Sequence, residues 1–224
     1  MMIQAIIIIL IALTSAFFSS AHADVLPGEA ERLLPQLRSE IDKFWPGLSI
    51  RAFPAAVIEQ ESRWKVRAEL KTQREHGVGL GQFTQAFTAD GATRFDALTE
   101  TKRLDPSLKD WSWQDPYNVQ YQLRGVVLKL ALNNRGCAPL MYDDKNALAC
   151  SAAQYNGGSG STSKRIRLCR ITSGCDAGKW FDNLEHQCPQ SRTKVAGYGE
   201  DFCTINSRYP GRVFDRIKKY EGKL

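Results

Sequence analysis

All six cysteines of this 224-residue chain lie in its second half, and they constrain the fold more than any other feature. An even set without a Cys-x-x-Cys pair indicates a disulfide framework. No histidine has ligand-like spacing to the cysteines, so we expect neither a metal nor another cofactor. We predict three disulfides between sequence neighbours: Cys137–Cys150, Cys169–Cys175 and Cys188–Cys203. The N-terminal half has no such cross-link and must be stabilised by packing.

The N-terminus indicates export, which is the setting in which disulfides persist. Residues 3–18 are nearly all apolar, and Ala21-His22-Ala23 follows the small-x-small rule of signal-peptide cleavage sites. The apolar run is shorter than the roughly 20 residues of a membrane span, which favours a cleaved signal over an uncleaved anchor. We therefore expect a signal peptide over residues 1–23. The mature chain, residues 24–224, would be a single periplasmic or secreted domain without stable membrane insertion.

The net charge of +6 belongs entirely to the mature chain, because residues 1–23 contain no Lys, Arg, Asp or Glu. A basic exported protein suits an anionic polymer, either cell-wall polymer or a membrane surface. No basic run with interleaved aromatic residues is dense enough to indicate nucleic acid, so we expect no nucleic-acid partner.

The spacing of apolar residues predicts a mainly α chain. We expect helices over residues 27–45 and 50–62, from Asp115 to about residue 136, from Asp143 or Asp144 to residues 155–158, and through Val213, Ile217 and Tyr220. Asp115 is expected to cap the long central helix, with Pro116 in its first turn. Residues 64–78 are predicted to be irregular, residues 83–95 to carry a short helix, and residues 158–163 to form a flexible loop.

Two glutamates lie near the end of the helix predicted over residues 50–62. Glu59 and Glu61 are two positions apart, so they point to different faces. The apolar run at residues 55–58 indicates a buried helix, and burial raises the pKa of a carboxyl group enough for acid catalysis. A solvated helix end is the ordinary alternative for such a residue. Only one of the two can face a given cleft, so the helix alone leaves open which of them is the candidate acid.

Four short motifs follow one another in a fixed order: Glu61-Ser62, Gly79-Leu80-Gly81-Gln82, Ala153-Gln154-Tyr155-Asn156-Gly157-Gly158, and Tyr209 followed by Val213. Each alone also fits a helix cap or a turn feeding a helix. Together they resemble the Slt-type lytic transglycosylases, lysozyme-like helical enzymes that cleave peptidoglycan and are related to goose-type lysozymes. The resemblance covers about residues 50–220. It implies a lysozyme-like domain, peptidoglycan glycan strands as substrate, and cell-envelope machinery as a candidate partner.

The resemblance implies a role for each motif. Glu61 would protonate the glycosidic oxygen between N-acetylmuramic acid and N-acetylglucosamine. As a base it would then activate the muramyl 6-hydroxyl, which gives a 1,6-anhydro product without a second carboxylate. Ser62 would orient Glu61, and Tyr209 would lie beside it. Glu59, on another face of the helix, would have a structural role. The sugar-binding residues would be Gln82, Tyr155 and Asn156.

Two departures from the family pattern leave alternatives open. Gly81 stands where the family more often has methionine, which removes a contact to a sugar ring. Glu75 is a candidate second carboxylate, which would make the protein a goose-type muramidase; a solvated loop charge is its ordinary interpretation. A catalytically inert glycan-binding module is the third alternative. Trp64, Trp111 and Trp113 could stack on sugars, although core packing is the commoner role of tryptophan.

Overall fold

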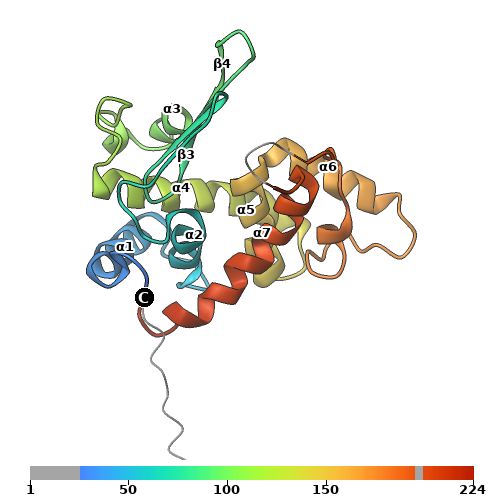
Figure 1. Ribbon diagram of the computed structural model, residues 1–224. Helices are drawn as coiled ribbons and strands as arrows, with labels where there is room; N and C mark the ends of the chain where they lie inside the picture. The colour runs from blue at the N-terminus through green and yellow to red at the C-terminus, as the bar shows by residue number, and fades with distance from the viewer. Residues whose placement is uncertain (1–25, 195–198) are drawn as a thin grey trace, which may run out of the picture.

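The computed structural model describes residues 26–194 and 199–224, so the expected signal peptide lies outside the described residues. The described chain is mainly helical, as predicted, with a small antiparallel sheet (Figure 1). It also contains three disulfides. The α-helices are α1 (Ala30–Phe44), α2 (Phe53–Ser62), α3 (Ala97–Lys102), α4 (Val119–Cys137), α5 (Asp144–Gly157), α6 (Ser159–Arg170) and α7 (Phe202–Ile217). The strands are β1 (Glu69–Lys71), β2 (Glu75–Val78), β3 (Phe83–Phe87) and β4 (Thr93–Asp96). Over these described ranges, no helix is long and apolar enough to cross a membrane.

Helix α2 is buried in the larger hydrophobic core, where it packs against α4 and α7. Its side chains Phe53, Val57 and Ile58 are fully buried, which confirms the prediction of a buried helix. The helix begins at Phe53 rather than near Ile50. It ends at Ser62, and the next residue, Arg63, takes a left-handed conformation with φ of 53°. Glu61 therefore lies in the last turn of a helix that the core holds in place.

The helix starts differ from prediction at two places. Helix α4 begins at Val119 and is capped by Asn118, whose side chain accepts a hydrogen bond from the Tyr121 N–H at 3.1 Å. The expected cap, Asp115, instead pairs with Ser112 in an isolated bridge, so the helix starts after it. Helix α7 is longer than expected and includes Tyr209, which is therefore not in a turn.

The four-stranded antiparallel sheet, in the order β1-β2-β3-β4, was not predicted. Residues 64–78, predicted to be irregular, contain β1 and β2. The short helix expected over residues 83–95 is also wrong, because most of this segment forms β3, a turn and β4. In the β2–β3 ladder Val78 pairs with Phe83, and both side chains are buried. Pairing and burial outweigh the weak local signal of such short strands. The β3–β4 hairpin extends away from the helices (Figure 1).

The C-terminal half contains a second, smaller core in which the cross-links are embedded. The predicted pairs Cys137–Cys150, Cys169–Cys175 and Cys188–Cys203 are confirmed. The flexible loop predicted over residues 158–163 is wrong, because residues 159–163 form the first turns of α6. The buried residues of α6 have helical spacing, but one of them is a charged residue, which hid the pattern: Thr162, Arg165, Ile166 and Cys169.

Candidate active site

A cavity of about 300 Å³ collects side chains from α2, the sheet, α4, α5 and α7. Five residues proposed from the sequence line it: Glu61, Glu75, Gln82, Tyr155 and Asn156. A second cavity of about 640 Å³ shares part of this wall and continues along α3, α4 and the start of α6. Residues that lie far apart in the sequence therefore meet in one cleft.

Glu61 is partly buried in the wall of the first cavity, and its carboxylate contacts α7. Burial raises the pKa of Glu61 from 4.5 to about 7. Two groups oppose this rise: the Tyr209 hydroxyl, which donates a hydrogen bond to Glu61 Oε1, and the positive charge of Lys129. Burial has the larger effect, so the carboxyl group of Glu61 is poised to donate or accept a proton near neutral pH.

Glu59 points to a different environment, as helical geometry required. Its carboxylate accepts hydrogen bonds from Lys219 Nζ and from the Tyr220 hydroxyl, both at 2.6 Å. The Trp64 indole N–H donates to the same Tyr220 oxygen at 2.7 Å. These contacts attach the end of the chain to α2, which supports the structural role expected of Glu59.

The glycine-rich turn after β2 is fixed by its neighbours. Gly79 has φ of +74°, and the next backbone N–H, that of Leu80, donates to Gln122 Oε1 at 2.5 Å. Gln82 lines the cavity, while its amide nitrogen donates to the Gly79 carbonyl at 3.1 Å and holds the turn closed. The turn thus presents Gln82 to the cavity with a fixed orientation.

The neighbouring side chains leave no space for a side chain at position 81. The Tyr155 hydroxyl donates to the Gly81 carbonyl at 2.7 Å. A Cβ at position 81 would lie 2.6 Å from that hydroxyl oxygen and from Val126 Cγ2, and 2.7 Å from Phe83. Glycine at position 81 therefore allows the turn to lie directly against α4 and α5.

The Ser62 hydroxyl makes a different hydrogen bond from the one expected, which was to orient Glu61. Its hydroxyl donates to the Ile58 carbonyl at 3.1 Å within α2, and the side chain is buried outside the cavity wall. Asn156, by contrast, is exposed and lines both cavities. Of the residues expected to bind sugar, Gln82, Tyr155 and Asn156 line the cavity.

Glu75 lies on strand β2 and not on a loop, which corrects the ordinary interpretation made from the sequence. Its partly buried side chain lines both cavities, and Arg94 Nη2 lies 3.9 Å from its Oε1 atom. A second carboxylate therefore shares the cavity wall with Glu61.

None of the three tryptophans considered for sugar stacking lines either of these two cavities. Trp64 and Trp111 are fully buried, and Trp113 packs against His76, with ring centres 5.4 Å apart. Two phenylalanines that the sequence did not single out line both cavities with exposed area, Phe95 at 37% and Phe202 at 40%. No spacing signal marked them, because they come from a short strand and a helix start.

Lys129 was also missed, although a signal existed. It is the one charged residue in the apolar stretch at residues 126–132 of α4. It lines both cavities, and its Nζ lies 4.7 Å from the centre of the Tyr155 ring. A lone cation in the apolar part of a helix indicates a candidate site residue.

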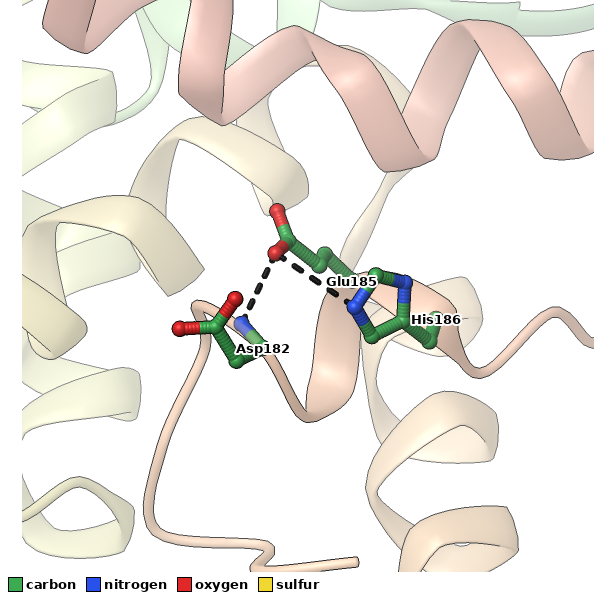
Figure 2. Close-up of side chains that lie close together, drawn as sticks. All are labelled: Asp182, Glu185 and His186. Carbon is green, nitrogen blue, oxygen red and sulfur yellow. Dashed lines mark hydrogen bonds and ion pairs between the residues drawn. The ribbon is translucent and has the colours of Figure 1, made fainter.

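Asp182, Glu185 and His186 form a surface cluster of ligand-type side chains before α7 (Figure 2). The Asp182 backbone N–H donates to Glu185 Oε1 at 2.8 Å, and His186 Nε2 lies 3.8 Å from the same oxygen. These contacts within the cluster account for its arrangement. None of the three lines the Glu61 cavity.

No family model matches this sequence, and no curated protein matches it significantly.

The raised pKa of Glu61 predicts a stability effect that does not depend on any activity. The folded chain binds the Glu61 proton more tightly than the unfolded chain does, so its stability falls as pH rises from 4.5 to about 7. A Glu61→Gln variant has no group to ionise there. It should therefore be more stable than the wild type at about pH 8, by on the order of 3 kcal/mol, and nearly equal at about pH 4.

Thermal unfolding at the two pH values measures this difference, which should appear as a higher Tm of the variant at about pH 8. The matched control is Glu221→Gln at an exposed position, which should change stability by less than about 0.5 kcal/mol. Equal stability of wild type and Glu61→Gln at about pH 8 would contradict the raised pKa.

Proposed function

We propose that this protein is a peptidoglycan lytic transglycosylase with a lysozyme-like fold. The observation that carries the proposal is the partly buried Glu61 carboxyl, with a pKa of about 7, in a cavity with Gln82, Tyr155 and Asn156. An acid with this pKa can protonate a leaving oxygen and take a proton back under the same conditions. The basic charge of the chain and its disulfides suit an exported protein that acts on the cell wall.

The proposed reaction needs one carboxyl group. Glu61 donates its proton to the glycosidic oxygen between N-acetylmuramic acid and N-acetylglucosamine. The resulting carboxylate takes the proton of the muramyl 6-hydroxyl, whose oxygen bonds to the anomeric carbon and closes a 1,6-anhydro ring. The hydrogen bond from Tyr209 holds the Glu61 carboxylate in one orientation through both steps. Gln82 and Asn156 supply amides for hydrogen bonds to sugar N-acetyl and hydroxyl groups.

Glu75 supports a second candidate function, that of a goose-type muramidase. Its position on the same cavity wall as Glu61 would suit a carboxylate that activates a water molecule. The product would then be a reducing muramyl end, formed by hydrolysis.

Mass spectrometry of purified peptidoglycan digested with the protein separates the two functions. We expect products with 1,6-anhydromuramyl ends, which are lighter than the hydrolysis products by one water molecule. Reducing muramyl ends would contradict the transglycosylase proposal and favour the hydrolase. A Glu75→Gln variant run alongside should lose turnover only if Glu75 activates the water.

A further inference from the structure

The positively charged side chain of Lys129 forms part of the wall of the candidate active site. It projects from the apolar stretch of α4 and lines both cavities where they share a wall. Its ammonium lies over the Tyr155 ring, 4.7 Å from the ring centre, which is a cation–π distance. The Tyr155 hydroxyl in turn donates a hydrogen bond to the Gly81 carbonyl. Tyr155 therefore contacts both the Lys129 ammonium and the glycine-rich turn.

Acidic groups from three elements and an aromatic ring from a fourth lie around Lys129. Burial lowers the pKa of Lys129, whereas the negative charges of Glu61 on α2 and Glu100 on α3 favour its charged form. Glu75 on β2 lines the same two cavities. Tyr155 on α5 offers the face of its ring. A cation that is costly to bury is therefore retained beside the candidate acid.

We propose that Lys129 is the positioning cation of this site. It holds the Tyr155 ring on one side and stabilises the Glu61 carboxylate that remains after proton transfer. The catalytic part of this role rests on the proposed function, whereas the interaction between Lys129 and Glu61 does not.

The proposal predicts the pH profile of a Lys129→Met variant. Without the positive charge, Glu61 keeps its proton to higher pH, so the decline of kcat/KM at high pH should move upward by about one pH unit. The maximum rate should fall as well, because the carboxylate formed in the first step is less stable. Lys129→Arg keeps the charge and should keep the wild-type profile. A loss of rate that is equal at every pH would indicate a packing role and would overturn the proposal.

A second measurement does not need turnover. Unfolding free energies of wild type, Glu61→Gln, Lys129→Met and the double variant form a double-mutant cycle. We expect the two substitutions to be non-additive at about pH 8, where Glu61 is ionised, and additive at about pH 4. Lys129→Gln replaces Lys129→Met if the methionine variant does not fold.

The two measurements separate the proposals. Coupling at about pH 8 with no turnover of peptidoglycan by the wild type would overturn the proposed function and support the Lys129–Glu61 interaction. Additive behaviour at both pH values, with turnover intact, would overturn the role of Lys129 alone. Additive behaviour without turnover would overturn both.

Discussion

A Glu61→Gln variant is expected to lose peptidoglycan turnover by about 10²–10⁴-fold while it stays folded and continues to bind glycan. Removing a general acid costs this much when no other group can supply the proton. Glutamine keeps the size of the side chain and an oxygen that can accept the Tyr209 hydrogen bond. Turnover is measured as the release of soluble fragments from purified peptidoglycan, and binding by co-sedimentation with the insoluble polymer.

This variant is informative because unfolding cannot explain its loss of activity. The pKa of Glu61 predicts that Glu61→Gln is more stable than the wild type above neutral pH. If the variant is inactive and has a higher Tm, its loss of activity comes from the missing carboxyl group and not from unfolding. If Glu61→Gln retains the turnover of the wild type, Glu61 is not the acid. If the wild type itself binds glycan without turnover, the protein is a glycan-binding module.

A Gly81→Met variant, which restores the residue more usual in the resembled family, is expected to lose stability and activity together. Its Cβ would lie 2.6 Å from both Tyr155 Oη and Val126 Cγ2, so the turn must move. Overpacking of this kind costs about 1–3 kcal/mol. Displacing the turn by about 1 Å would also misplace Gln82 and lower turnover by about 10²-fold. Thermal unfolding and fragment release measure the two effects.

Gly136→Met is the matched control, because a Cβ at Gly136 meets no other atom within 4 Å. Gly136 lies in α4, where methionine is the better helix former, so this variant should be as stable as the wild type or slightly more stable. Full activity in Gly81→Met would mean that the turn rearranges freely. The close approach at Gly81 would then be unnecessary for the site.

The parts of the fold that were predicted correctly have strong local signals. Helix α2 has a continuous apolar run, and α5 has Asp143 as its cap, whose side chain accepts from the Asn146 N–H at 2.8 Å. The sheet and α6 had no such signal. Short strands are stabilised by pairing with partners that the local sequence does not reveal. In α6 the buried position of Arg165 depends on acceptors from other segments, including the Leu184 carbonyl at 2.9 Å.

The candidate site was predictable where a motif carried it. Glu61, Gln82, Tyr155 and Asn156 came from ordered motifs, and they line one cavity. Lys129 and Phe95 belong to no motif, because their position in the cavity follows from the packing of α4 and the sheet. The role of such residues depends on their neighbours in three dimensions, so it can be recognised only from the structure.

The hydrogen bond between Tyr209 and Glu61 joins residues 148 positions apart, and that between Tyr220 and Glu59 spans 161. Contacts between residues so far apart in the sequence cost loop-closure entropy before they stabilise the fold. The Glu61 carboxyl therefore acquires its final surroundings only when α7 docks on α2. A chain in which α7 has not yet docked would carry Glu61 without the hydrogen bond that orients it. If Glu61 is the acid of the proposed function, activity would appear only when the fold is complete.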